Sequence, residues 1–164
     1  MRFWSRVTAL AFPPKRGSAG FAAWNRLTAL NVWLYRRTRG RLGGRFDGAP
    51  VLLLHHVGRK TGQRRVNPLL YMPDGENMVI VASWGGAPHH PAWFLNLKAN
   101  PETEVEVRGR RIPVRAEVAS PEERKRLWPR LVDLYPGYAN YQARTEREIP
   151  LVILRRLPPP SRDQ

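Results

Sequence analysis

The chain has 164 residues, of which 42% are apolar, with 16 prolines and 13 glycines, a composition that suits one compact, turn-rich domain. It has no cysteine, which excludes disulfide bonds, thiolate metal sites and cysteine nucleophiles, and its four histidines form two adjacent pairs that match no metal-ligand spacing. The net charge is +15 and is unevenly distributed along the chain, because residues 1–65 carry 14 Lys and Arg against one acid. Such an excess suits a nucleic acid, an anionic membrane surface or a polyanionic small molecule as partner. The alternative is a basic surface that only keeps the protein soluble.

The segment of residues 1–18 is basic and contains one apolar run, residues 7–12, which ends at a pair of prolines. This run is too short to span a bilayer, and no small-residue cleavage site follows it. We therefore expect a cytoplasmic protein that is not exported.

A helix is predicted over residues 19–38, where apolar residues recur at the spacing of one helical face. This apolar stripe consists of Ala23, Leu27, Leu30 and Leu34. Arginines lie near the helix end, where cations favour the helix dipole, and Gly40 is suited to stop the helix. Two interpretations remain open. The stripe packs on the core, or Trp24, Trp33 and Tyr35 act with the flanking arginines as a peripheral anchor on anionic lipid at the inner face of the cell membrane.

Three apolar segments in the middle of the chain are predicted to be strands. Residues 51–54 form a continuous apolar run typical of a buried strand, and it leads into His55 and His56. We interpret both histidines as packed strand residues outside the site, because no carboxylate is near them in the sequence. Residues 66–72 and 78–83 are predicted to pair as a hairpin about the Pro-Asp-Gly-Glu-Asn turn.

Two glycine-containing turns flank this hairpin. Residues 58–65 read Gly-Arg-Lys-Thr-Gly-Gln-Arg-Arg, and residues 83–86 read Ser-Trp-Gly-Gly. An antiparallel hairpin brings both turns to the same end, so the cations of the first lie beside glycines whose backbone N–H groups can approach a ligand closely. The arrangement indicates an anion-binding site.

A short helix is predicted over residues 91–100, because proline is tolerated in its first turn and an Asn-Pro pair closes it. Within this helix Trp93 and Leu97 share one face, and Asn96 lies near Trp93. Trp93 and Asn96 can therefore meet the same ligand, although Trp93 can equally be a core residue.

A second hairpin and a second helix are predicted after residue 102. Residues 103–107 and 112–118 alternate in the manner of paired strands. The helix that follows begins at Ser120-Pro121 with a capping-box spacing, and Pro129 is expected to kink or break it.

Three tyrosines then recur at intervals of three residues, namely Tyr135, Tyr138 and Tyr141. If a helix restarts after the intervening Pro-Gly pair, their rings can line the mouth of a pocket for a flat aromatic substrate that carries oxygen. Three half-buried packing tyrosines are the alternative.

Residues 151–154 supply a closing strand. The short antiparallel strands with inserted helices predict a mainly β fold of the α+β class, a small β-barrel with helical covers. We expect a basic segment and an amphipathic helix in residues 1–40, the barrel domain in residues 41–157 and a disordered tail in residues 158–164.

Several segments in combination resemble the deazaflavin-dependent nitroreductase and quinone reductase family of actinobacteria. They are residues 58–62, 65–69, 81–88, 91–97 and 99–101, within a likeness that extends from residue 31 to residue 157. The resemblance implies a split β-barrel of the flavin-reductase type that binds coenzyme F420, an 8-hydroxy-5-deazaflavin whose tail carries a phosphate and a run of glutamates. Trp84 departs from the family pattern, in which lysine is common at this position.

The resemblance also implies roles for individual residues. Arg59, Lys60 and Arg65 would meet the phosphate and the tail, and the Gly85-Gly86 turn would approach the ring. The complete implied coenzyme-binding set is Arg59, Lys60, Thr61, Arg65, Val66, Asn67, Pro68, Leu69, Leu70, Val81, Ala82, Ser83, Trp84, Gly85, Gly86, Ala92, Trp93, Asn96 and Tyr138. The residues expected at the reacting atoms are Ser83, Tyr135, Tyr138 and Tyr141.

The implied activity is hydride transfer from reduced F420 to a quinone-like acceptor such as menaquinone, or to a nitroaromatic compound. The coenzyme supplies this chemistry, so no metal is expected. A non-catalytic F420- or flavin-binding split barrel is the alternative. Nucleic-acid binding is not expected, because it rests on charge alone, without a zinc spacing, an RNA-binding strand motif or a recognition helix.

Overall fold

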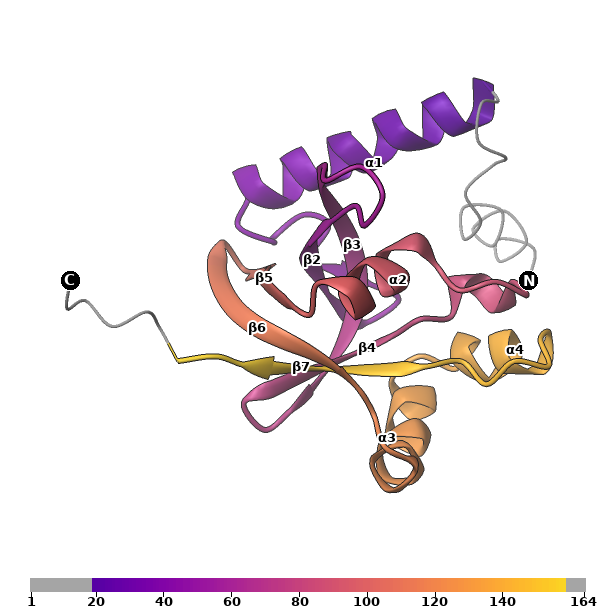
Figure 1. Ribbon diagram of the computed structural model, residues 1–164. Helices are drawn as coiled ribbons and strands as arrows, with labels where there is room; N and C mark the ends of the chain where they lie inside the picture. The colour runs from indigo at the N-terminus through magenta and orange to yellow at the C-terminus, as the bar shows by residue number, and fades with distance from the viewer. Residues whose placement is uncertain (1–18, 159–164) are drawn as a thin grey trace.

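The computed structural model describes residues 19–158 and is built around a barrel of antiparallel strands with helices on its outside (Figure 1). The strands are β1 (Arg45–Phe46), β2 (Ala49–Val57), β3 (Arg64–Asp74), β4 (Asn77–Val81), β5 (Glu102–Val107), β6 (Arg110–Val118) and β7 (Leu151–Arg156). The helices are α1 (Ala19–Arg37), α2 (Ala92–Ala99), α3 (Pro121–Leu134) and α4 (Gly137–Ala143), with the short 3-10 turn η2 (Trp84–Gly86).

The barrel closes through one pairing between strands that are distant in sequence. The strand order is β2-β3-β4-β7-β6-β5, and β5 returns to β2 where Leu53 faces Glu106 and Leu54 faces Val105. The two-residue strand β1 pairs with the first two residues of β2. Closure satisfies the backbone groups that an open sheet would expose at its edges, and it confirms the predicted β-barrel with helical covers.

Strand alternation divides the apolar residues between the barrel interior and the covering helices. Leu52 and Leu54 point into the interior core, whereas Val51 and Leu53 pack with Tyr35 beneath α1. On the far side of the barrel, alternate residues of β4 and β7 pack against α3 and α4. Because both faces of β2 are covered, its sequence shows the continuous apolar run from which a buried strand was predicted.

Helix α1 has almost the predicted bounds but packs through a different face. Val32 and Tyr35 make the contact with β2 and β3, and the Tyr35 hydroxyl donates to the carbonyl of Val51 at 3.1 Å. Leu27 and Leu30 are 54% and 52% exposed, so the interpretation that their stripe packs on the core is wrong. Tyr35 is 1% exposed and is therefore not available as a lipid anchor.

A buried carboxylate fixes the end of α1 to the barrel. Glu106 on β5 accepts hydrogen bonds from Arg36 of α1 at 2.5 Å and pairs with His55 of β2 at 2.6 Å. Burial would raise the pKa of Glu106, but the bonds from Arg36 and His55 outweigh it and hold the pKa below its ordinary value. His55 therefore has a carboxylate partner in space that was not apparent in the sequence.

Turns and helix ends refine the predicted elements. The two hairpins turn at Gly75-Glu76 and Arg108-Gly109, which are tighter turns than the sequence suggested. The capping box of α3 is present, since Ser120 and Glu123 exchange hydrogen bonds. Pro129 does not break α3, which continues as one helix to Leu134. Buried Leu127 and Leu131 anchor the helix on both sides of this proline and offset its missing hydrogen bond.

No helix within residues 19–158 is long and apolar enough to cross a membrane.

Candidate functional site

The loop between β2 and β3 presents the basic cluster of the site. Backbone hydrogen bonds from Thr61 and Gly62 to the carbonyl of Gly58 fold residues 58–62 into a tight turn. A Cβ atom at Gly58 would lie 2.5 Å from the Thr61 hydroxyl, so a side chain at this position would force the Thr61 side chain to turn away. The four exposed cations of the loop region are Arg59, Lys60, Arg64 and Arg65. None of the ion pairs found within residues 19–158 involves them, so the loop lacks an internal counter-charge.

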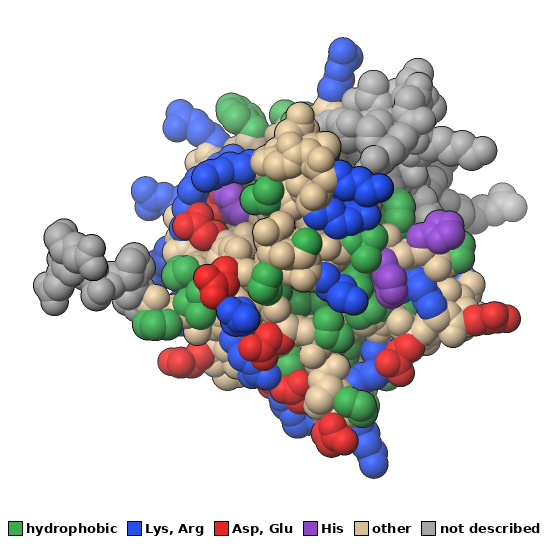
Figure 2. Space-filling model, viewed as in Figure 1, with side chains coloured by type: hydrophobic (Ala, Val, Ile, Leu, Met, Phe, Trp, Pro, Cys, Tyr) green, Lys and Arg blue, Asp and Glu red, His purple; other side chains and the backbone are tan. Residues whose placement is uncertain are grey.

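Charge is unevenly distributed over the face of the molecule that Figure 2 shows. Figure 2 shows Lys and Arg side chains predominating over the upper part of the molecule, where α1 lies in Figure 1, and most Asp and Glu side chains over the lower part. A polyanion would be attracted to the upper part of this face.

Helix α2 holds the basic loop through one amide side chain. The backbone N–H of Arg59 donates to Asn96 Oδ1 at 3.1 Å, and the Arg59 guanidinium lies 3.4 Å from the same oxygen. Asn96 is 4% exposed and bonds in turn to His56, which bonds to Asn67. Three of the predicted coenzyme residues, Arg59, Asn67 and Asn96, are thus brought together by a histidine that the prediction left out.

The Gly-Gly turn packs directly against the tyrosine helix α4. Trp84, Gly85 and Gly86 have φ values of +42°, +62° and +82°, a left-handed conformation that favours glycine. A Cβ atom at Gly86 would lie 2.4 Å from the carbonyl oxygen of Tyr141. Any side chain at this position would separate the turn from α4, so glycine is needed to keep the two elements together.

One arginine that the sequence did not reveal fixes both ends of this turn. Arg147, in the segment before β7, donates to the carbonyls of Ser83 at 2.9 Å, Ala82 at 3.3 Å and Ala87 at 2.9 Å. Its guanidinium also lies 3.3 Å from Nδ1 of His90. Partial burial lowers the pKa of Arg147, which remains charged at neutral pH and so binds carbonyl oxygens strongly.

The three tyrosines form one aromatic cluster. The Tyr135 ring lies 5.1 Å from that of Tyr138 and 6.2 Å from that of Tyr141, and the hydroxyls of Tyr135 and Tyr141 are 3.1 Å apart. Burial raises the pKa of Tyr135 and of Tyr138, so both hydroxyls stay protonated at neutral pH. The ring of Phe46 of β1 lies tilted against that of Tyr135, with ring centroids 6.3 Å apart, and extends the cluster.

The apolar residues predicted to bind the coenzyme are divided among three cores. Trp93 and Ala82 lie in the barrel interior, with Leu69 packed against them. Val66 packs beneath α1, and Val81 packs with Tyr138 beside α3 and α4. Ser83 is buried, and its side chain makes no capping hydrogen bond to the 3-10 turn that follows it.

The remaining members of the predicted set lie near the surface. Thr61 and Ala92 are exposed, and Pro68 and Trp84 are half-buried. Leu70 packs against the cores beneath α1 and beside α3. Leu70 and the aliphatic core residues of the set have no polar side-chain group, so they can shape a binding site but cannot hold a charged ligand.

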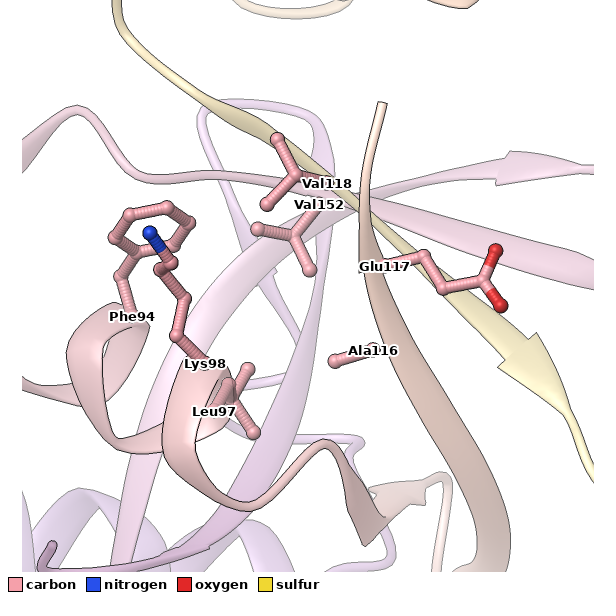
Figure 3. Close-up of a pocket in the computed structure, with 7 residues that line it drawn as sticks. All are labelled: Phe94, Leu97, Lys98, Ala116, Glu117, Val118 and Val152. Atoms are coloured by element: carbon pink, nitrogen blue, oxygen red, sulfur yellow. The ribbon is translucent and has the colours of Figure 1, made fainter. Parts of the chain in front are cut away.

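A small hollow lies away from this arrangement, between α2 and the β6–β7 pair (Figure 3). Its lining residues are Phe94, Leu97, Lys98, Ala116, Glu117, Val118 and Val152. None of them belongs to the predicted coenzyme or substrate residues, so the hollow is separate from the candidate site. Within residues 19–158 no group of acidic residues and histidines could hold a metal ion.

A model of the F420H(2)-dependent quinone reductase family matches residues 27–156. The chain belongs to this family. An F420H(2)-dependent quinone reductase of Mycobacterium tuberculosis is 46% identical over 134 residues, which cover 79% of this chain and 90% of that protein. A solved F420-H2 dependent reductase is 39% identical with a TM-score of 0.59, over 64% of this chain and 93% of that one. Another solved structure, described as a domain-swapped dimer, is 34% identical with a TM-score of 0.62, over 81% and 98%.

Family membership confirms the resemblance and the split-barrel fold, and it allows the site to be tested against the coenzyme. A ligand with a phosphate and several carboxylates needs cations that are not neutralised by the protein. The loop of residues 58–65 provides such cations. The Trp84–Gly86 turn is packed against α4, with Gly85 and Gly86 buried. The cations of the basic loop therefore fit the anionic tail of F420.

Proposed function

We propose that this chain is an F420-dependent quinone reductase, in which a quinone accepts a hydride and a proton to become a hydroquinone. The observation that carries the proposal is the basic loop, whose cations have no internal counter-charge and whose backbone is held by Asn96 of α2. In the same fold, the Gly-Gly turn packs against the helix that carries the tyrosine cluster. Family membership supports the same activity.

The coenzyme would be held by three groups of residues. Arg59, Lys60 and Arg65 would bind the phosphate and the glutamate tail. The backbone of residues 82–86 would approach the ring, with Trp93 and Asn96 contributing from α2. When bound, reduced F420 supplies the hydride, so that the protein itself needs to bind, orient and exclude water rather than perform the redox step.

The tyrosine cluster would serve the acceptor. An oxygen of the quinone gains negative charge as the hydride arrives, and hydroxyl donors placed there stabilise it. Because burial raises the pKa of Tyr135 and Tyr138, their hydroxyls remain donors throughout the neutral range. Nitroaromatic compounds also develop charge on oxygen during reduction, so they are included as acceptors.

Turnover should respond to the loss of one hydroxyl. We expect Tyr138→Phe to lower kcat with a menaquinone analogue at least about tenfold, because one donor to an oxyanion typically contributes that much or more. The dissociation constant of F420 should stay the same. Tyr71→Phe is the matched control, since Tyr71 packs against the barrel core. Unchanged quinone reduction by Tyr138→Phe would remove Tyr138 from the reaction.

The quinone-reduction assay also distinguishes a reductase from a non-catalytic carrier of F420. A carrier would bind F420 tightly but would not reoxidise its reduced form when a quinone is added. A reductase would reoxidise it at a rate that saturates with quinone concentration. FMN serves as the comparison ligand, and preference for FMN over F420 would contradict the coenzyme assignment.

We further infer that α1 contacts an anionic membrane surface from the cytoplasmic side, where lipid-soluble quinones are within reach. Arg26, Leu30, Trp33 and Arg37 follow one another at helical spacing on the outward face. Trp33 is 58% exposed and Leu30 52% exposed. Exposed apolar side chains between arginines are typical of helices that lie in the lipid headgroup region. Trp24 was also expected there, but its side chain lies outside the described residues.

Vesicle binding tests this contact. We expect Trp33→Ser to lower co-sedimentation with phosphatidylglycerol vesicles about fivefold, because the indole ring is lost from the interface. Val118→Ser is the control, since Val118 is 52% exposed on β6, away from α1. Equal loss in both variants, or binding that is equal on neutral lipid, would contradict the inference. A soluble dimer disrupted only by Trp33→Ser would instead assign the face to a second copy of the chain.

A further inference from the structure

A buried histidine network lies directly behind the basic loop. His56 of β2 is 4% exposed, and both of its ring nitrogens are bonded. Nε2 lies 2.7 Å from Asn67 Oδ1, and Nδ1 lies 3.0 Å from Asn96 Nδ2. Asn96 in turn accepts the backbone N–H of Arg59. The network thus runs from β3 through β2 to α2 and ends on the backbone of the loop.

The polarity of this network is fixed at its loop end. A backbone N–H can only donate, so the Asn96 atom that faces Arg59 must be its oxygen. The Asn96 amide nitrogen then faces His56 Nδ1, which must accept. The proton of a neutral His56 is therefore on Nε2, where Asn67 Oδ1 accepts it. One tautomer of one neutral ring satisfies all of the partners.

A charged His56 cannot satisfy them. An imidazolium carries a proton on Nδ1 as well, which would point at the N–H of Asn96 across 3.0 Å. Rotating the Asn96 amide would relieve that clash, but it would turn its nitrogen toward the Arg59 backbone N–H and guanidinium, both of which are donors. Protonation of His56 therefore places two donors face to face at 3.0 Å or, if the Asn96 amide rotates, breaks the bond between α2 and the loop.

We propose that His56 is a positioning residue for the anionic tail of the coenzyme: its neutral ring holds Asn96, Asn96 holds the backbone of Arg59, and protonation of the ring releases the basic loop. This inference rests on the proposed function, in which the loop binds the tail. His56 itself need not touch the coenzyme.

The charged surroundings of His56 favour its neutral form. Arg65 lies opposite it on β3, His55 precedes it on β2 and is bonded to Glu106 of β5, and the guanidinium of Arg59 lies beyond Asn96. From α2 the neutral amide of Asn96 bonds to it. Burial chiefly, then the charge of Arg65, lowers the pKa of His56 below its ordinary value, although the bond to Asn67 opposes the shift.

The sign of the pH effect follows from this direction. Above an ordinary histidine pKa of about 6.5, His56 is neutral in both the folded and unfolded chain. As pH falls below that value the unfolded chain takes up a proton first, so folding stability decreases until the lowered pKa of the folded state is passed. Loop release, and with it loss of coenzyme affinity, belongs to the acidic end of this range.

Titration of the protein with oxidised F420 across pH, followed by tryptophan fluorescence, tests the proposal. We expect the wild-type dissociation constant to rise about tenfold more on acidification than that of His56→Asn, whose side-chain oxygen replaces Nδ1 as acceptor but does not titrate. His56→Leu offers no acceptor and should bind about tenfold more weakly already at neutral pH. Ionisation of the ligand and of other groups is common to all three proteins and is removed by comparing them.

The free protein provides an independent readout. In a spectrum of the 15N-labelled histidines, the signals missing from His56→Asn identify His56, and they should show a neutral ring protonated on Nε2. A proton on Nδ1, a charged ring at neutral pH, or equal pH profiles for wild type and His56→Asn would overturn the proposal. If wild type binds no F420 at any pH, the proposed function fails and this inference with it, whereas normal binding without these differences defeats the inference alone.

Discussion

Reversing the charges of Lys60 and Arg65 together should weaken the binding of F420 about a hundredfold. Both side chains are exposed in the loop region, and neither has a carboxylate partner within the described residues. A hydrogen bond to a charged group contributes about 1.5 kcal/mol or more, so two lost contacts amount to about 3 kcal/mol, which is about a hundredfold in the dissociation constant. Fluorescence titration of Lys60→Glu/Arg65→Glu measures this loss.

The control must carry the same change in net charge. Arg110→Glu/Lys125→Glu reverses two exposed cations on β6 and α3, away from the loop, and should weaken binding only a few fold through the long-range field. Raising the ionic strength should shrink the long-range component more than the contact component. If the two double variants lose affinity equally, the loop has no specific role and F420 is attracted by overall charge alone.

Much of the fold could be predicted because its elements carry their own local signals. The apolar run at residues 51–54, the alternation of the later hairpin and the capping box at Ser120 each depend on neighbours in sequence. Barrel closure through Leu53 and Glu106 could not be read in the same way, since it joins strands about fifty residues apart. It was inferred from the count of strands and from family resemblance.

The buried face of α1 could not be predicted from local spacing. Leu27 and Leu30 have the spacing of a core stripe, but the barrel surface beneath α1 accepts Val32 and Tyr35 instead. The face with Tyr35 is the buried one because the Tyr35 hydroxyl donates to the carbonyl of Val51 and accepts a hydrogen bond from the backbone N–H of Arg108. Periodicity detects that a helix has an apolar face, but not which of two faces the fold will cover.

Candidate site residues could be predicted where they belong to a sequence motif, but not where their role depends on contacts with residues distant in the sequence. Arg59, Asn96 and the tyrosines belong to segments that resemble a family. His56 looked like a packed strand residue, and its role depends on Asn67 and Asn96, which come from two other elements. Phe46 lies in a two-residue strand too short to leave a pattern. Arg147 lies in an irregular polar segment, and no signal in the sequence distinguishes it from the other arginines there.

Arg147→Met should destabilise the protein by about 2 kcal/mol and loosen the Gly-Gly turn. The guanidinium binds three carbonyls of residues 82–87, and methionine would leave these acceptors without their charged donor. Urea unfolding measures the loss of stability. Hydrogen exchange of the Gly86 and Ala87 amides, which bond to Ser83 and Trp84 within the turn, reports on the turn itself.

Arg156→Met separates the contact from the mere loss of a charge. Arg156 is exposed at the end of β7 and has no ion pair within residues 19–158, so its replacement should change stability by less than about 0.5 kcal/mol. Three results together would show that Arg147 acts by shaping the backbone that approaches the ring. Arg147→Met would accelerate amide hydrogen exchange only at the turn, weaken F420 binding, and leave the NMR signals of Tyr135 and Tyr141 unchanged. If exchange at the turn stays slow while global stability falls, Gly86 packed on Tyr141 is sufficient to hold the turn, and Arg147 serves only to bind the last segment to the barrel.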